Sequence, residues 1–128
     1  HPAPRPGHPS CQDVLHRDMP QLEKAWSLKA QFAANIYLRL AKTGGELEVW
    51  DWAPNDEEAK ALHLGHHDFY DRAKLPPPAA RIRPLQGELL LTLSSRIHAV
   101  LPGQGGPRVA MSCFVGYRGE DQTLTMWS

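Results

Sequence analysis

Two stretches in the C-terminal third alternate apolar and other residues, and they constrain the fold more than any other feature. The first runs from Leu89 to Leu101 and the second from Val109 to Tyr117. A turn cluster rich in proline and glycine separates them at residues 102–107. A period of two is typical of half-buried strands, so these stretches predict a β meander that includes a last strand after Gly119. Helical spacing also fits the first stretch, but the glycine-rich turn and the second alternating run favour a hairpin.

The composition favours one β-rich domain and excludes several classes of protein. The 128 residues suit a single domain, and 12 prolines with 10 glycines are many helix breakers for a helical bundle. The 14 basic residues balance 14 acidic ones, which argues against a nucleic-acid binder held by bulk charge. Because no apolar run approaches the roughly 20 residues of a membrane span, we expect neither a nucleic-acid nor a membrane partner.

The cysteines bear on the redox compartment of the protein, and the first residue bears on its processing. Cys11 and Cys113 lack the spacing of a metal or redox motif, which leaves two free thiols in a reducing compartment or one disulfide in a secreted protein. The first interpretation predicts a cytoplasmic location. The chain begins with His1 rather than methionine, so we expect a processed protein or a domain of a longer one. A proline-rich arm is expected at residues 1–11 and a folded core at residues 12–128.

Residues 20–42 carry the pattern that is hardest to interpret. Apolar side chains recur there at i, i+3, i+4 and i+7, with Pro20 at the start and the pair Gly44 and Gly45 after the end. Proline suits a first helical turn and glycine suits a helix end. The spacing alone therefore predicts a helix over this stretch.

The following segments predict a strand and then a short helix. Residues 46–53 alternate as a strand does. Asn55 and Glu58 have the form of a capping box, which predicts a helix over residues 56–63.

The charges along the chain are unevenly distributed. Residues 46–58 hold six acidic residues and no basic one, whereas residues 72–83 hold four basic residues and no acidic one. We interpret these segments as solvated faces that can form salt bridges with each other.

Three residues form a candidate metal site, and a cationic anchor is expected beside them. His16 and Asp18 are two residues apart, so in a strand both side chains point to one face, about 6–7 Å apart. A hairpin folded at the glycine-rich turn would place His98 opposite Arg108, with Ser112 further along the same face. Two histidines and one carboxylate form the facial triad of non-haem Fe(II) oxygenases, and Arg108 suits a dicarboxylate cosubstrate.

With these residues the chain resembles the 2-oxoglutarate/Fe(II)-dependent dioxygenases of the prolyl-hydroxylase-like group. The resemblance runs from about Val14 to Ser128. It follows the family's order of His-x-Asp, a Tyr-Leu strand, Gly-Gly-Glu-Leu, a Pro-x-x-Gly-x-Leu strand, the distal histidine, and an arginine ten residues later. The stretches that carry it are HRD at 16–18, QFAANIYLRLAKTGGELEVWDW at 31–52, PLQGELLLTLSSRIHAV at 84–100, and GPRVAMSCFVGY at 106–117 with the closing WS at 127–128.

The resemblance implies an iron centre that performs oxidation. His16, Asp18 and His98 match the family's Fe(II) ligands. Fe(II) is then the cofactor, 2-oxoglutarate the cosubstrate and O2 the oxidant. Related halogenases lack the carboxylate ligand, so Asp18 favours hydroxylation.

The resemblance also implies residues that hold the cosubstrate. Arg108 matches the partner of the C5 carboxylate of 2-oxoglutarate, and Tyr37 matches the strand tyrosine that often hydrogen-bonds that carboxylate. Ser112 matches a small hydroxyl residue beside it. Asn35 shares the face of Tyr37 and is a candidate for the cosubstrate or iron shell.

The fold that the resemblance implies is a double-stranded β-helix, a mainly β jelly roll with one or two short helices. It replaces the helix predicted from spacing by a long strand, preceded by a short helical turn near residues 20–25. The strands are expected near residues 12–17, 28–41, 46–52, 67–71, 80–84, 87–94, 97–101 and 108–117, with a final strand at 123–127.

The expected reaction is hydroxylation of an unactivated C–H bond in an amino-acid-like small molecule. The WDW segment and the His-x-Asp…His core resemble bacterial enzymes that act on amino acids or small metabolites. A peptidyl-proline substrate is one alternative, and a non-catalytic jelly-roll module for binding or sensing is another. The sequence leaves the oligomeric state open.

Two further groups of side chains have a structural interpretation as well as a functional one. Trp50 and Trp52 point to one face of a strand, where they suit a wall of the substrate pocket or core packing equally. His63, His66 and His67 lie in a loop outside the family's motif, so we interpret them as solvated or substrate-side.

Overall fold

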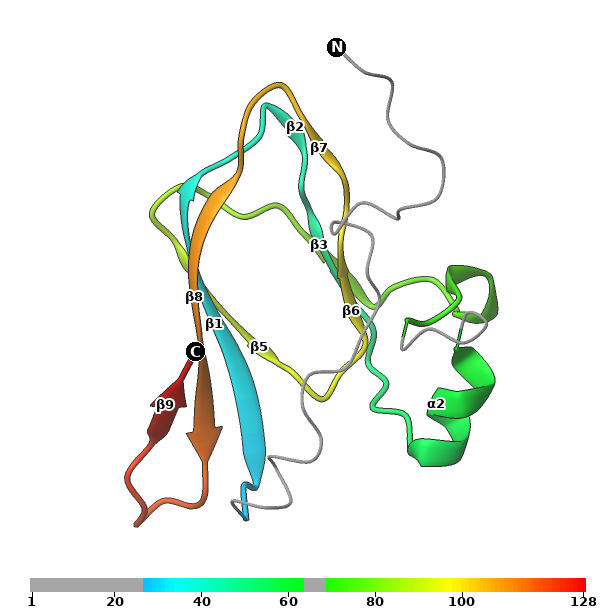
Figure 1. Cartoon of the computed structure of the whole chain (residues 1–128), viewed down its shortest axis with the longest axis vertical. Helices are drawn as coiled ribbons and strands as arrows, with labels where there is room; N and C mark the ends of the chain where they lie inside the picture. The colour runs from blue at the N-terminus through cyan, green and yellow to red at the C-terminus, as the bar shows by residue number, and fades with distance from the viewer. Residues whose placement is uncertain (1–26, 64–68) are drawn as a thin grey trace.

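The computed structural model describes residues 27–63 and 69–128, which form a mainly β fold (Figure 1). No helix in this part of the chain is long and apolar enough to cross a membrane. The expected arm, the strand at 12–17 and the helical turn near 20–25 lie outside it. The elements are β1 (Ala30–Arg39), β2 (Thr43–Gly44), β3 (Leu47–Val49), α2 (Asp56–Leu62), η1 (Arg72–Lys74), β4 (Ala80–Ile82), β5 (Leu89–Leu93), β6 (His98–Val100), β7 (Gly103–Gln104), β8 (Val109–Tyr117) and β9 (Thr125–Trp127).

The larger sheet has four antiparallel strands in the order β5-β1-β8-β9. Strand β1 pairs with β5 on one side and β8 on the other, so the backbone groups of this central strand are satisfied on both of its sides. The strand expected over 28–41 from the family resemblance is confirmed, and the helix predicted from spacing is wrong in the described residues. The spacing misleads because both faces of β1 carry apolar side chains, which removes the alternation of a half-buried strand.

The second sheet is smaller, in the order β4-β3-β6, and β2 pairs with β7 in a short two-stranded ladder. Figure 1 shows the four-stranded sheet at the left and the smaller sheet at the right, with α2 beyond it. Gly44 in β2 has a φ of 71°, and a Cβ there would collide with the carbonyl oxygen of Pro102. The close approach of β2 and β7 therefore requires glycine.

The C-terminal strands do not form the predicted meander. Strand β5 pairs with β1 and β6 pairs with β3, so among the described strands β5 to β9 only β8 and β9 are neighbours in both the chain and the sheet. The predicted hairpin that places His98 opposite Arg108 is wrong, because β6 and β8 belong to different sheets and β7 between them pairs with β2. Alternation identifies a strand and its buried face, but the partner depends on how the two sheets pack.

The strand expected at 67–71 is wrong where the structure describes it. Tyr70 makes a single β-bridge with His63, and the chain then enters η1. The Asp71 side chain accepts a hydrogen bond from the backbone N–H of Ala73, which caps the 3-10 turn. The predicted residues 67 and 68 lie outside the described residues, as do His66 and His67.

Helix α2 begins where the capping box predicts it. The Asn55 side chain accepts hydrogen bonds from the backbone N–H groups of Glu57 and Glu58, and the Glu58 carboxylate accepts one from the N–H of Asn55. The helix ends at Leu62, one residue before the expected end, and Leu62 is buried. This helix thereby contributes to a core cluster with Trp50, Tyr70, Ile97 and Ala99.

The acidic and basic segments pair with each other. Glu48 is fully buried, and its carboxylate accepts hydrogen bonds from Arg72 at 2.5 Å and from Arg81 at 2.6 Å. Glu46 pairs with Arg83 at 3.1 Å. Burial alone would raise the pKa of the Glu48 carboxyl, but the hydrogen bonds and charges of the two arginines outweigh it and hold this pKa below its ordinary value.

Candidate functional site

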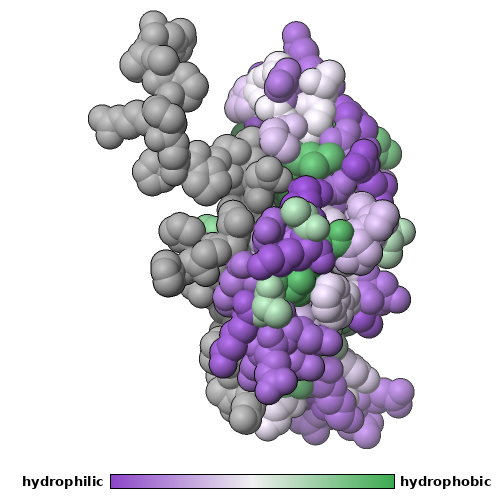
Figure 2. All heavy atoms as spheres, turned by 90° about the vertical axis from the view of Figure 1, so that its right-hand side faces the viewer, coloured by the Kyte–Doolittle hydropathy of each residue, from purple (hydrophilic) through white to green (hydrophobic). Residues whose placement is uncertain are grey.

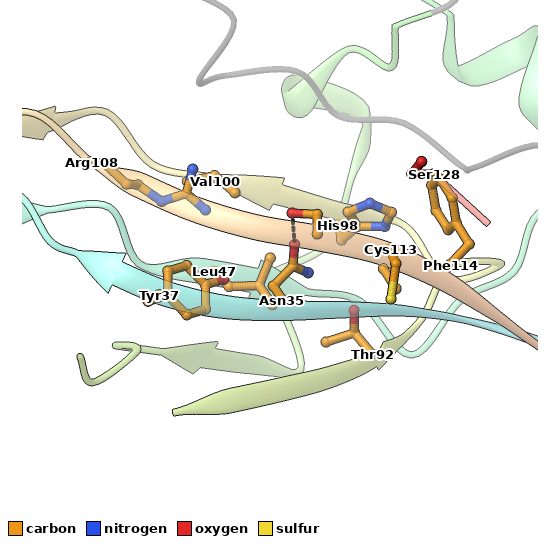
Figure 3. A pocket seen from close by; sticks show the side chains of 12 residues that line it. Asn35, Tyr37, Leu47, Thr92, His98, Val100, Arg108, Cys113, Phe114 and Ser128 are labelled. Atoms are coloured by element: carbon orange, nitrogen blue, oxygen red, sulfur yellow. Dashed lines mark hydrogen bonds between the residues drawn. The ribbon is translucent and has the colours of Figure 1, made fainter. Parts of the chain in front are cut away.

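A pocket of about 370 Å³ lies between the two larger sheets. Side chains from β1, β5 and β8 line one side, and side chains from β3 and β6 line the other (Figure 3). Its volume is near the lower end of the range for small-molecule sites, about 300–1,000 Å³. Residues that the sequence singled out line this pocket: Asn35, Tyr37, His98, Arg108 and Ser112.

His98 opens strand β6 on the pocket side of the smaller sheet. Its Nδ1 lies 2.8 Å from the carbonyl oxygen of Arg96. Since a carbonyl only accepts, Nδ1 carries the proton, and the lone pair of the neutral ring is on Nε2. Arg96 pairs with the exposed Asp51 at 3.1 Å, and backbone hydrogen bonds of Ile97 with Trp50 and Trp52 hold this turn against the segment after β3. A histidine held in this way has the tautomer of a metal ligand that coordinates through Nε2.

Arg108 precedes β8 and reaches into the pocket beside β1. Its guanidinium carbon lies 5.1 Å from the centre of the Tyr37 ring, and Tyr37 is 2% exposed. The Nε of Arg108 is buried without a hydrogen-bond partner, and no carboxylate pairs with this arginine within residues 27–63 and 69–128. A half-buried cation whose Nε–H is buried without an acceptor is unfavourable, so this end of the pocket is suited to an anionic ligand.

Asn35 and Ser112 face each other across the β1–β8 pair, in the middle of the pocket. The Ser112 hydroxyl donates a hydrogen bond of 2.5 Å to the Asn35 side-chain oxygen. The Asn35 amide nitrogen thus remains as a donor on this face. This hydrogen bond orients Asn35. A role of Ser112 beside the C5 carboxylate of 2-oxoglutarate stays a prediction.

Figure 3 separates the pocket into two ends. Arg108 and Tyr37 lie at one end, Asn35 is central, and His98 lies toward Phe114 and Ser128 at the other. A ligand that contacts both Arg108 and a group held by His98 must therefore extend along β1.

The remaining candidates lie elsewhere. Trp50 is buried in the core cluster with its Nε1 donating to the carbonyl oxygen of Pro76 at 2.7 Å, and Trp52 packs against the same cluster. Neither tryptophan lines the pocket that holds His98, and their placement suits the core interpretation. His63 stacks on Tyr70 away from this pocket, whereas Cys113, a free cysteine, lines it.

His16 and Asp18 lie outside the described residues. Within the described residues, no group of three histidine, cysteine, aspartate or glutamate side chains could hold a metal ion. His98 is thus the one expected iron ligand that the structure locates.

Sequence reasoning missed part of the pocket wall. Phe114 is two residues beyond Ser112 and shares its face, so alternation in β8 could have identified it. Thr92 lies opposite Ala33 in the β1–β5 register, which the sequence alone does not give.

Comparison with known proteins agrees with the geometry. The family model of the 2OG-Fe(II) oxygenase superfamily matches residues 8–116, which is most of the chain. No curated protein and no solved structure matches the chain. The prolyl-hydroxylase-like subgroup stays a prediction. The mainly β fold of facing antiparallel sheets is that of a jelly-roll oxygenase. The chain therefore belongs to the 2OG-Fe(II) oxygenase superfamily, and it is a 2-oxoglutarate-dependent dioxygenase that uses Fe(II), 2-oxoglutarate and O2.

Proposed function

We propose that Arg108 and Tyr37 bind the C5 carboxylate of 2-oxoglutarate. The observation that carries this proposal is the uncompensated Arg108 guanidinium, whose Nε is buried without a partner beside the buried Tyr37 ring. A carboxylate would supply the missing acceptor and neutralise the charge. The Tyr37 ring holds the guanidinium by a cation–π contact, which restricts its direction before the cosubstrate binds.

The proposed Fe(II) ligands are His16, Asp18 and His98. The support for His98 is its Nδ1 contact with the carbonyl oxygen of Arg96, which gives the ring the tautomer that coordinates a metal through Nε2. His16 and Asp18 are proposed from the His-x-Asp motif. Asn35, oriented by Ser112, would donate its amide N–H to the cosubstrate between the two ends of the pocket.

The proposed reaction is hydroxylation of an unactivated C–H bond in an amino-acid-like small molecule. When bound, Fe(II) and 2-oxoglutarate supply the oxidising chemistry, in which 2-oxoglutarate and O2 yield succinate and CO2 and one oxygen atom enters the substrate. The protein fixes the cosubstrate at Arg108, orients His98 through Arg96, and lines the remaining space with apolar walls such as Phe114. The modest pocket volume favours a small substrate over a bulky one.

Product analysis tests this proposal. The protein is incubated with Fe(II), 2-oxoglutarate and a panel of free amino acids, and succinate and hydroxylated products are measured by mass spectrometry. We expect succinate formation coupled to a product that has gained one oxygen atom, and loss of both in His98→Ala. Leu85→Ala, in an exposed turn, is the matched control.

The outcomes distinguish the alternatives. Turnover with proline-containing peptides and none with free amino acids would replace the small-molecule substrate by a peptidyl one. Equal succinate release from wild type and His98→Ala would refute the catalytic role of His98.

A further inference from the structure

The far end of the pocket, beyond His98, contains a row of three side chains that crosses the four-stranded sheet. Ala33 on β1 lies opposite Thr92 on β5 and opposite Phe114 on β8, and all three line the pocket. Ala33 has the smallest side chain of the three and stands between the other two. The row therefore forms a recess with Ala33 as its floor and Thr92 and Phe114 as its sides, which we call the Ala33 recess.

The Phe114 side of the recess is held in place by β9. Phe114 lies opposite Trp127 in the β8–β9 register, and the two rings are stacked with their centres 5.6 Å apart. Aromatic rings at this separation attract each other, so the stack restricts the direction of the Phe114 ring. Because this ring is only half-buried, part of its apolar surface is left for contact with a ligand.

The far end of the pocket lacks charged side chains in the part of the chain that the structure describes. The described residues that line it are Ala33, Thr92, Cys113, Phe114 and Ser128, and none of them is an aspartate, glutamate, lysine or arginine. Arg108 lies at the opposite end (Figure 3). A charged group in the recess would lose its hydration without gaining a counter-charge from these residues, which is unfavourable.

The outside of the molecule contrasts with this end of the pocket. Figure 2 looks onto the side that carries α2 and shows mainly hydrophilic residues there. The first turn of α2 alone holds Asp56, Glu57 and Glu58. The described chain thus has many charged side chains at its surface, and the recess is lined by uncharged ones.

The recess is the space that the cosubstrate would leave free. Under the proposed function, 2-oxoglutarate extends from Arg108 past Asn35 toward the group held by His98 (Figure 3). The Ala33 recess adjoins His98 beyond this stretch. A pocket of about 370 Å³ in all then leaves room for a small side chain rather than for a bulky ring system.

We propose that the Ala33 recess receives an uncharged aliphatic side chain of the substrate, and that Ala33 and Phe114 determine which side chains are accepted. This inference rests on the proposed function and narrows its substrate class to amino acids with aliphatic side chains. Phe114 favours apolar groups because their contact removes apolar surface from water. Ala33 sets the depth of the recess and with it the length of the side chain. The ionised ammonium and carboxylate groups of the amino acid lie outside the recess.

Binding of two amino acids of similar length tests the inference. Norleucine and lysine both have an unbranched side chain, and only that of lysine ends in a charge. Equilibrium dialysis of the radiolabelled amino acids against the full chain, loaded with Fe(II) and 2-oxoglutarate without O2, measures both Kd values. We expect norleucine to bind at least about tenfold more tightly than lysine, because the recess offers lysine no counter-charge.

Two variants test whether the recess determines this selectivity. Phe114→Ala removes apolar contact and should raise the Kd of norleucine about tenfold. Ala33→Val fills the floor with a residue that suits a strand, so it should raise the Kd of norleucine to a similar degree and leave that of alanine unchanged. The Kd of 2-oxoglutarate should stay unchanged in both, since Arg108 lies at the other end of the pocket. Leu85→Ala, at an exposed position outside the pocket, is the matched control.

The outcomes separate this inference from the proposed reaction. Lysine that binds as tightly as norleucine would overturn the inference, and so would the failure of both amino acids to bind. A norleucine Kd that both variants leave unchanged would overturn it too. Norleucine that binds selectively but gains no oxygen atom when O2 is admitted would support the recess and refute the proposed reaction. Hydroxylation of lysine without that of norleucine would support the reaction and refute the recess.

Discussion

Three arginines of this protein occupy two contrasting electrostatic environments. Arg72 and Arg81 both reach the buried carboxylate of Glu48, at 2.5 and 2.6 Å. Arg108 meets the ring of Tyr37 instead, and its Nε has no hydrogen-bond partner. Arg72 and Arg81 share a carboxylate as their counter-ion, whereas Arg108 lacks an anion among the described residues. The Glu48 charge on β3 therefore stabilises the fold, whereas the Arg108 charge beside β1 is the one that we propose for a ligand.

The largest expected effect concerns Arg108, the arginine that lacks an anion. Arg108→Met removes the cation that we propose for the C5 carboxylate and should raise the Kd for 2-oxoglutarate about 30-fold or more, because truncating one side of a buried charge pair costs at least about 2 kcal/mol. Calorimetric titration of 2-oxoglutarate into the Fe(II)-loaded protein without O2 measures this. Arg81→Met is the matched control and should bind 2-oxoglutarate normally. Equal affinities in Arg108→Met and wild type would show that the guanidinium holds no carboxylate.

The next largest effect concerns the ion pairs of Glu48 with Arg72 and Arg81. Glu48→Gln leaves two arginines beside a neutral amide and should lower the free energy of unfolding by about 2–3 kcal/mol. The loss stays below that of a fully buried pair because the Arg72 and Arg81 side chains are 41% and 60% exposed. Urea denaturation followed by tryptophan fluorescence gives the value. The affinity for 2-oxoglutarate should not change, since Glu48 points away from the pocket that Leu47 lines.

The same carboxylate predicts a dependence of stability on pH. The pKa of Glu48 is held below its ordinary value of 4.5, so near that pH the unfolded chain binds the proton more readily than the folded one. The stabilisation is complete above pH 4.5 and is lost as the pH falls through the lowered folded pKa. The difference in unfolding free energy between wild type and Glu48→Gln should therefore shrink below pH 4.5. A difference that stays constant down to strongly acidic pH would contradict the ion-pair account.

The sequence predicted the strands of the fold better than their pairing. Alternation identified β8, and the capping box at Asn55 identified the start of α2. Both signals are local, because they depend on residues within one element. Pairing is not local: β5 follows β4 in the chain but joins β1 in the other sheet. For β1 the apolar side chains on both faces imitate a helical spacing, and only the family resemblance gave the right element.

The same contrast between local signals and non-local pairing applies to the candidate site. His98 and Arg108 were grouped through a hairpin that does not exist, yet both line one pocket because the facing sheets bring them together. The cation–π contact of Arg108 with Tyr37 depends on the β1–β8 register, in which Tyr37 faces Ala110. The hydrogen bond between Ser112 and Asn35 depends on it too. Residue types therefore predicted the members of the site, and register decided their contacts.

The smallest expected effect concerns the Gln31 side chain, a neutral polar group that is buried like the Nε of Arg108. Gln31 is fully buried on the inner face of β1, and neither its side-chain oxygen nor its nitrogen has a hydrogen-bond partner in the part of the chain that the structure describes. Gln31→Met keeps the length of the side chain and removes this unsatisfied amide, so it should raise the free energy of unfolding by about 1 kcal/mol. Ser94→Ala is the control of opposite sign, because the Ser94 hydroxyl donates to the backbone oxygen of Gln31 at 3.0 Å. Chemical denaturation of both variants measures the two changes in the free energy of unfolding. Destabilisation by Gln31→Met would show that this amide is satisfied in solution and that Arg108 is the sole incomplete polar group of the two.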